Sequence, residues 1–230
     1  MRPVPQTAIP RSEDAIRFVR LPGVYRPQDD TRLLAQALRG EDLSTKPHVL
    51  DLCTGTGALA VLAARLGAGS VTAVDVSRRA VWSARANAWS RRLPVRVRRG
   101  RLVDPVRGER FGLVLANPPY VPYAASPVIA QRSGAWDAGL DGRDHLDRLC
   151  ATVAEVLEPG GTLLLVQSSM CGNNRTCERL ASAGIEAEVS IRSVVPFGPV
   201  MTERASWLED QGYILPGQRE EELVVIRGTR

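Results

Sequence analysis

The chain has 230 residues, of which 44% are hydrophobic and 24% charged, a composition typical of a globular protein long enough for one α/β domain. No apolar run approaches the roughly 18–20 residues that cross a bilayer, and the N-terminus lacks the apolar core of a signal peptide, so we expect a cytoplasmic protein without a membrane segment. The formal net charge is +5, but Lys46 is the only lysine, and this arginine bias does not by itself indicate an anionic partner.

The first part of the chain predicts an arm followed by a helix. Residues 1–23 contain prolines and no sustained period, which predicts an N-terminal arm with a short strand towards its end, in residues 17–25. Residues 24–230 are expected to form the domain. The segment RLLAQALRG places its leucines on one helical face, with Asp30 as a suitable N-cap and Gly40 as a suitable stop.

From residue 49 onward, apolar runs and helical patterns alternate. Buried or half-buried strands are predicted at residues 49–52, 71–74, 95–97, 111–116, 162–166, 185–191 and 223–226. Helices are predicted at residues 55–66, 78–89, 146–157, 175–183 and 202–209, with Ser77 and Thr202 as N-caps. The right-handed crossover rule then implies an α/β fold with a doubly wound, mostly parallel sheet and an antiparallel strand near the C-terminus.

The stretch FGLVLANPPYVP ends one of these strands abruptly. Proline cannot donate to a sheet ladder, and it pushes the preceding residue into extended geometry, so the strand is predicted to stop at Asn117. The motif Asn117-Pro118-Pro119-Tyr120 would then lie at the carboxyl edge of the sheet, where open α/β folds bind ligands. The alternative is a proline-rich loop without a function of its own.

A glycine turn, Cys53-Thr54-Gly55-Thr56-Gly57, follows an earlier strand and opens a helix, as a nucleotide-binding loop does. We expect this turn, including Thr54, to bind a cofactor, because Gly55 and Gly57 allow a ligand to approach the backbone closely. Asp75 ends the next strand about 20 residues further on, where a carboxylate can accept hydrogen bonds from both hydroxyls of a ribose.

Two cofactor classes fit this turn. The sequence GTGALA matches the dinucleotide pattern of NAD enzymes, but Asp51 would place an anion where a pyrophosphate has to bind. S-adenosylmethionine carries a sulfonium and an ammonium, which suit that anion better, and Asp30 and Thr31 can add acceptors for its amino-acid end. The alternative interpretation of Asp51 is a carboxylate that holds neighbouring N–H groups of the loop.

The Asn-Pro-Pro-Tyr turn fits methylation of an amide or aromatic amino nitrogen. The lone pair of such a nitrogen is delocalised, and two acceptors, the side-chain oxygen of Asn117 and the carbonyl of Pro118, would localise and align it. Tyr120 would stack on the planar target group. No strong base is required, because the proton can leave after attack. We therefore assign structural or capping roles to His48 and His145. No metal site is predicted, since the four cysteines lack C-x-x-C spacing.

Three segments, VLDLCTGTGALAV, AVDVS and GLVLANPPYVP, together resemble the class I S-adenosylmethionine-dependent methyltransferases. Within them the chain is similar to the HemK/PrmC group of protein glutamine-N5 methyltransferases, which act on the Gly-Gly-Gln loop of peptide release factors. GVYRPQDDTRLL resembles the short branch of this group, which lacks an N-terminal helical domain, and GAWDAGLDGRDHLDRL resembles the segment that follows Asn-Pro-Pro-Tyr.

The resemblance covers about residues 24–226 and implies a seven-stranded Rossmann-like methyltransferase sheet. It implies S-adenosylmethionine as cofactor, S-adenosylhomocysteine as product, and a glutamine side-chain amide of a release-factor-like protein as acceptor. It further implies that Leu102 packs on the adenine ring and that a small activator subunit can accompany the chain. Arg101 stands where the family usually has an acidic residue near the adenine amino group.

Other acceptors stay open at this point. The same turn chemistry serves exocyclic amines of adenine or cytosine in DNA or RNA, and nine arginines between Arg78 and Arg101 would suit a phosphate backbone. A solvated helix and edge strand is the other interpretation of these arginines. A small-molecule amine is a further alternative acceptor, and a binding module without activity is the non-enzymatic one.

Overall fold

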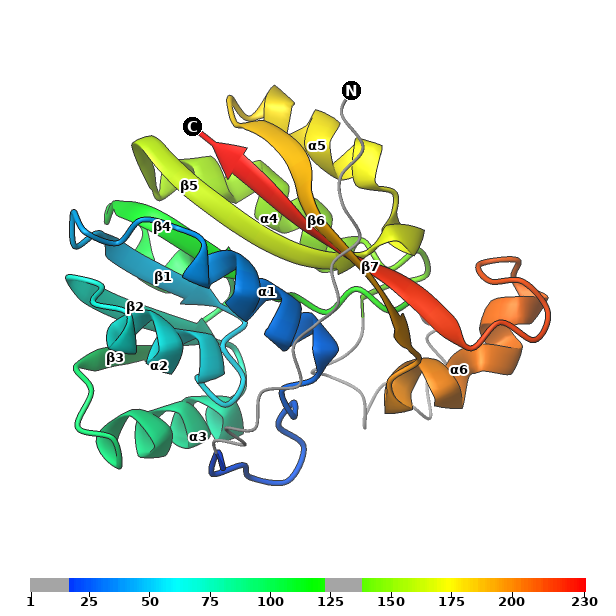
Figure 1. The fold of residues 1–230 in the computed structure, drawn as a ribbon, viewed down its shortest axis with the longest axis horizontal. Helices are drawn as coiled ribbons and strands as arrows, with labels where there is room; N and C mark the ends of the chain where they lie inside the picture. Colours follow the sequence, from blue (N-terminus) through cyan, green and yellow to red (C-terminus); the bar gives the residue numbers. More distant parts are fainter. Residues whose placement is uncertain (1–16, 123–137) are drawn as a thin grey trace.

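The computed structural model describes residues 17–122 and 138–230, and these form one mixed sheet covered by helices on both faces (Figure 1). The seven strands have the order β3-β2-β1-β4-β5-β7-β6. Their bounds are His48–Leu52 (β1), Ser70–Asp75 (β2), Val95–Arg99 (β3), Phe111–Ala116 (β4), Leu157–Ser168 (β5), Glu186–Pro196 (β6) and Glu220–Thr229 (β7). Only β7 runs antiparallel to its neighbours, which confirms the predicted fold class.

Helices pack against both faces of the sheet. Their bounds are Asp29–Arg39 (α1), Ala58–Arg65 (α2), Arg78–Trp89 (α3), Asp144–Thr152 (α4), Asn173–Ser182 (α5) and Pro199–Asp210 (α6). Short 3-10 turns cover Asp104–Val106 (η1), Val153–Glu155 (η2) and Ser169–Cys171 (η3). Helices α1, α2 and α3 lie on one face and α4 and α5 on the other (Figure 1). No helix in the described part of the chain is both long and apolar enough to cross a lipid bilayer.

The central strands form because their side chains are apolar on both faces. In β1 every residue after His48 is buried, and β4 is buried except at Gly112. Such continuous apolar runs are typical of parallel strands that helices cover on both sides. The edge strand β3 instead alternates valines with exposed or half-buried arginines, as its sequence predicts.

The direction of β7 determines what lies at the carboxyl edge of the sheet. Because β7 is antiparallel, it begins at the edge where β1, β2 and β4 end. The connection before it contains α6, which lies beyond the end of the sheet (Figure 1). Met201, Ala205 and Leu208 of α6 form a second apolar cluster with Ile214, separate from the main core. This small cluster packs against Val121, directly after the Asn-Pro-Pro-Tyr motif.

Residues 17–25 form an irregular segment with a turn at residues 22–23, and not the predicted strand. The N–H of Val19 donates to Oδ1 of Asn87 in α3 at 2.7 Å, and Nδ2 of Asn87 donates to the carbonyl of Val19 at 2.8 Å. A helix side chain therefore satisfies backbone groups that a strand would have paired with another strand. The rest of the predicted arm, and the start of the segment GAWDAGLDGRDHLDRL, lie outside the described residues.

The predicted helix over residues 146–157 is also too long. Helix α4 ends at Thr152, and β5 already begins at Leu157. The motif Pro159-Gly160-Gly161 lies inside β5 at a register shift, because Phe111 pairs with Leu157 whereas Leu113 pairs with Thr162. The glycines therefore accommodate a bulge in a strand.

Two of the three predicted N-caps are wrong. Helix α1 begins at Asp29, so Asp30 lies in its first turn and Gln28 occupies the N-cap position. Helix α6 begins at Pro199, because proline is favoured at the first helical position, and Thr202 lies inside the helix. The third is confirmed, since Oγ of Ser77 accepts the N–H of Ala80 at 3.4 Å.

Candidate active site

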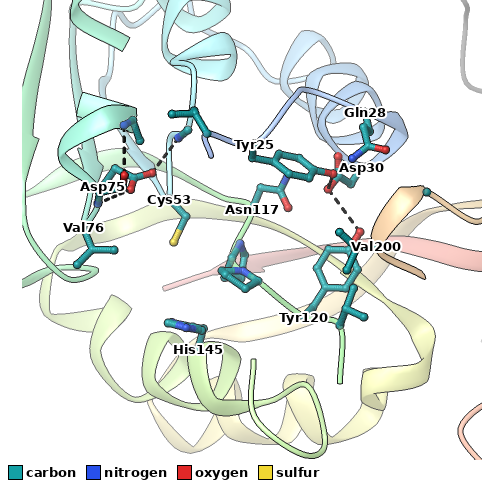
Figure 2. Close-up of a pocket in the computed structure, with 18 of the residues that line it drawn as sticks. Tyr25, Gln28, Asp30, Cys53, Asp75, Val76, Asn117, Tyr120, His145 and Val200 are labelled. Atoms are coloured by element: carbon teal, nitrogen blue, oxygen red, sulfur yellow. Dashed lines mark hydrogen bonds between the residues drawn. The ribbon is translucent and has the colours of Figure 1, made fainter. Parts of the chain in front are cut away.

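A cavity of about 320 Å³ lies at the carboxyl edge of the sheet. Its described walls come from the turns after β1, β2, β3 and β4, from the segment before α1, and from the region where β6, α6 and β7 meet. Figure 2 shows side chains from these separate elements around one hollow. Of the residues predicted for the site, those in the lining are Asp30, Gly55, Asp75, Leu102, Asn117, Pro118, Pro119 and Tyr120.

Asp75 joins the turns that follow β1 and β2. Its Oδ2 accepts the N–H of Gly55 at 2.9 Å, and its Oδ1 accepts the N–H of Ser77 at 2.8 Å (Figure 2). Burial raises the pKa of this carboxyl, and the backbone N–H groups oppose that rise. Each carboxylate oxygen keeps a further lone pair, so Asp75 can still accept hydrogen bonds from hydroxyl groups of a ligand.

Leu102 forms an apolar wall next to Asp75. It is buried and has φ of 44°, a left-handed conformation that is rare for a leucine. Arg101 precedes it in the turn, is exposed, and also lines the cavity. This side of the cavity therefore combines an apolar surface with a carboxylate, which suits a flat ring attached to a ribose.

Asn117 is oriented by the first turn of α1. The strand β4 ends at Ala116, as the two prolines predict, and Nδ2 of Asn117 donates to Oγ1 of Thr31 at 3.4 Å. With the amide nitrogen bonded to Thr31, Oδ1 of Asn117 is left as a hydrogen-bond acceptor on the other side of the amide. Thr31 itself is outside the cavity lining, so the structure shows it as a support for Asn117.

Two tyrosines bond to the carboxylate of Asp30. The hydroxyl of Tyr25 donates to Oδ2 of Asp30 at 2.6 Å, and the hydroxyl of Tyr120 donates to the same oxygen at 3.4 Å (Figure 2). Burial, and then the charge of Asp30, raise the pKa of both phenols, so both remain protonated donors. Tyr120 is thereby held with its hydroxyl turned to α1.

Sequence reasoning did not place Tyr25, His145 or Glu221 in the cavity. His145 lies in the second position of α4, and Figure 2 shows it opposite Asn117. Glu221 lies near the start of β7, is only 8% exposed, and also lines the cavity. In sequence, the run of acidic residues around Glu221 looks like a solvent-exposed face. The one signal for burial is that Glu221 lies two residues before the buried Leu223, and so on the same face if the strand begins earlier than predicted.

Asp51 lies behind the cavity and not in its lining. It is completely buried, and its Oδ2 accepts the hydroxyl of Thr54 and the N–H of Ala60, the latter at 3.0 Å. Its Oδ1 has no hydrogen-bond partner among the described residues, and burial raises the pKa of this carboxyl to about 7. The bond to Thr54 connects Asp51 to the glycine turn, which fits the alternative interpretation of Asp51.

Gly57 lies outside the cavity lining, and its role is in the packing of α2 against α3. Its φ is 80°, and a Cβ at this position would lie 3.0 Å from Cβ of Ala84 in α3. The glycine therefore allows α2 to pack closely against α3. Gly55, by contrast, faces the cavity with φ of 54°.

Comparison with known proteins identifies the family. A family model described as the methyltransferase small domain matches residues 15–133. The chain belongs to the methyltransferase small-domain family. It is similar to a Methanocaldococcus jannaschii protein whose name gives it as a candidate protein N5-glutamine methyltransferase, with 33% identity over 193 residues, 84% of this chain and 96% of that protein.

A bacterial member of the same group is longer. The chain is 40% identical over 172 residues to the release factor glutamine methyltransferase of Deinococcus radiodurans, which is 72% of this chain but 61% of that protein. The fold matches the solved structure of the E. cuniculi Mtq2–Trm112 complex, responsible for methylation of the eRF1 translation termination factor, with a TM-score of 0.64, 24% identity, and coverage of 90% of this chain and 99% of that chain.

Because the chain belongs to this methyltransferase family, it is an enzyme that uses S-adenosylmethionine. The cavity fits a cofactor with a positive sulfonium and ammonium. Among the described lining residues, Arg101 is the one arginine and lysine is absent, whereas the carboxylates in the lining are Asp29, Asp30, Asp75 and Glu221. In the described residues, no cluster of three or more histidine, cysteine, aspartate or glutamate side chains is placed to hold a metal ion.

Proposed function

We propose that this methyltransferase transfers a methyl group to the side-chain amide nitrogen of a glutamine in a protein, with a peptide release factor as the substrate. The observation that carries the proposal is the position of Asn117-Pro118-Pro119-Tyr120 in the lining of the cavity that also contains Asp75. The names of the archaeal and bacterial relatives support the acceptor. Such a substrate places the enzyme in the cytoplasm, where translation ends.

The roles of the lining residues follow from their chemistry. When bound, S-adenosylmethionine supplies an electrophilic methyl group on its sulfonium. Asp75 would accept hydrogen bonds from the ribose, the backbone of Gly55 would lie against the cofactor, and Leu102 would pack on the adenine. The carboxylate of Asp30 would lie near the positively charged part of the cofactor. The remaining predicted residues would act indirectly, by holding the turns around the cavity in place; they are Thr31, Asp51, Thr54 and Gly57.

Asn117 and Pro118 would bind the acceptor. An amide nitrogen is a weak nucleophile because its lone pair is delocalised into the carbonyl group. Hydrogen bonds from its N–H groups to Oδ1 of Asn117 and to the carbonyl of Pro118 would align this lone pair with the methyl group. Pro119 keeps the turn extended, and the ring of Tyr120, held through Asp30, would pack against the planar amide.

We further infer that a small activator subunit assists the enzyme. The support is the match to the E. cuniculi protein, which was solved in complex with Trm112 and of which this chain covers 99%. Co-purification of a small protein with the full chain, and a gain in activity when that protein is added, would support this inference.

The test uses radiolabelled S-adenosylmethionine with purified release factors and, separately, with nucleic acid and a small arylamine. We expect label in the release factor, at a glutamine side chain. Asn117→Ala should lower the rate by at least about 100-fold, because it removes one positioned acceptor, and should leave cofactor affinity nearly unchanged. The dissociation constant of S-adenosylhomocysteine, measured by calorimetry, checks the second part.

Asn174→Ala is the matched control, since Asn174 is exposed on α5. Asp75→Ala should show the opposite pattern and weaken the binding of S-adenosylhomocysteine. Label that enters only nucleic acid or only the arylamine would contradict the proposed substrate. A wild-type rate from Asn117→Ala would show that the motif is a loop without a catalytic role.

A further inference from the structure

Glu221 presents a buried carboxyl group in the cavity wall, next to the hydroxyl of Ser168 at the end of β5. The residue is 8% exposed, lines the cavity, and its Oε2 has no hydrogen-bond partner among the described residues. Asp30, the other carboxylate close to it, already accepts two tyrosine hydroxyls and the N–H of Thr31. A buried polar atom without a partner costs free energy, so a free oxygen in a cavity wall indicates a ligand group that bonds to it.

The strand order places Glu221 on the acceptor side of the motif. Asp75 ends β2, Gly55 follows β1, and Asn117 follows β4, so these three positions succeed one another across the sheet. Strand β7 lies further on in the same direction, beyond β5, and Glu221 is close to its start. A cofactor that extends from Asp75 to Asn117 therefore leaves Glu221 on the far side of Asn117, where the methyl acceptor enters.

The groups that act directly on Glu221 are a hydroxyl and a carboxylate. Burial, and then the charge of Asp30, raise the pKa of Glu221 to about 7, while a hydrogen bond from Ser168 opposes the rise. Glu221 acts in turn on Tyr25, Tyr120 and the thiol of Cys171 in η3, and burial keeps all three protonated. His145 also lines the cavity, from the second position of α4. The one arginine in the described lining, Arg101, follows β3, at the opposite end of the strand order.

We propose that Glu221 makes the acceptor end of the cavity selective for a neutral side chain that carries N–H groups, against the isosteric carboxylate. The proposal rests on the proposed function and names how the site distinguishes glutamine from glutamate. An amide N–H can donate to Oε2 of Glu221. A carboxylate in the same position would have the like charge of Glu221 beside it, which is selection by repulsion.

The test compares two small probes of the same shape, N-acetylglutamine methylamide and N-acetylglutamate methylamide. Their binding to the full chain saturated with S-adenosylhomocysteine is measured by NMR titration at pH 8, where Glu221 is ionised. We expect the wild type to prefer the amide by about 10- to 100-fold, the range of a hydrogen bond to a charged group. In Glu221→Gln, which keeps the shape but removes the charge, the two dissociation constants should differ by less than about threefold.

Glu220→Gln is the matched control, because Glu220 is the exposed neighbour on the same strand, and it should keep the wild-type preference. An unchanged preference in Glu221→Gln would overturn the proposal, and so would equal binding of both probes, or of neither, to the wild type. Failure of the proposed function is read separately, as the absence of methyl transfer to release factors by the wild type. If the methyl acceptor is a different compound with N–H groups, the wild type should still prefer the amide probe although it does not methylate release factors.

Discussion

Three carboxyl groups near the carboxyl edge of the sheet, of which Asp51 and Glu221 are buried and Asp75 is half-buried, differ in role because they differ in partners. Asp75 bonds to two backbone N–H groups and faces the cavity. Asp51 bonds inside the protein and does not face the cavity, while Glu221 faces the cavity and has one oxygen without a partner among the described residues. All three residues are carboxylic acids, so the contacts of each oxygen decide what the group can do.

Asp51 should make the stability of the protein depend on pH. Its folded-state pKa of about 7 lies above the usual value of about 4, so between pH 4 and 7 the folded state holds a proton that the unfolded state has released. Wild-type stability should therefore fall, relative to Asp51→Asn, as the pH rises through this window, by at most about 4 kcal/mol, and stay constant above it. Urea unfolding at pH 4.5, 6 and 8 measures this difference.

Asp42→Asn is the control for this prediction. Asp42 is exposed, and its pKa is lowered by hydrogen bonds from Ser44, so its stability contribution changes only below pH 4. The difference between wild type and Asp42→Asn should therefore be constant from pH 5 to 8. If Asp51→Asn also gives a constant difference, Asp51 is ionised in the folded protein throughout.

At the scale of elements, the turn between β1 and α2 depends on one close contact between helices. Gly57 precedes α2 in a left-handed conformation, and there is space for no more than a hydrogen atom between it and Ala84 of α3. The same turn presents Gly55 to the cavity. The packing of α2 on α3 thus determines where the turn can lie.

Gly57→Ala should destabilise the protein by about 2–4 kcal/mol. A left-handed alanine costs about 1–2 kcal/mol, and the contact of 3.0 Å with Cβ of Ala84 adds overpacking of a similar size. Gly67→Ala separates the two terms, because Gly67 has φ of 95° but nothing within 4 Å of the added Cβ. Gly67→Ala should therefore lower the free energy of unfolding only by the cost of the left-handed alanine, about 1–2 kcal/mol. Equal free energies of unfolding for the two variants, measured with urea, would show that the helix contact is relaxed without cost.

At the scale of the whole molecule, Asn87 joins three parts of the chain. This completely buried side chain of α3 bonds to the N–H and the carbonyl of Val19, and its Nδ2 also donates to the carbonyl of Thr56 at 2.9 Å. It therefore fastens residues 17–25, which bring Tyr25 into the cavity wall, to the glycine turn. One residue on a helix links the N-terminal segment to the proposed cofactor site.

Asn87→Ala should release this segment and weaken cofactor binding together. Leaving the backbone groups of Val19 without partners should cost about 2–3 kcal/mol of stability. The dissociation constant of S-adenosylhomocysteine should rise about tenfold, equal to about 1.4 kcal/mol of lost wall contacts. Calorimetry measures the affinity, and the rate of trypsin cleavage after Arg20 reports release of the segment. Faster cleavage with unchanged affinity would show that the segment does not contribute to binding.

Much of the fold and part of the site could be predicted from the sequence because their causes are local. Apolar runs predict the central strands, and Pro118 and Pro119 end β4 whatever the tertiary contacts of the segment are. The errors come from groups whose partners are remote in sequence. Residues 17–25 bond to Asn87, and the glycines before Thr162 serve a bulge opposite Phe111 and Leu113.

The sequence by itself determined the alternation of strands and helices, the end of β4 just before Asn117 and the position of Asp75 at the end of β2, since each depends on neighbouring residues. Tertiary structure alone decided which polar groups meet in the cavity. It turned Asp51 inward to Ala60, bonded Asn117 to Thr31, and brought Glu221 to the site. The last of these follows from the reversed direction of β7, which no local pattern around Glu221 encodes, because strand direction depends on how the whole sheet is assembled.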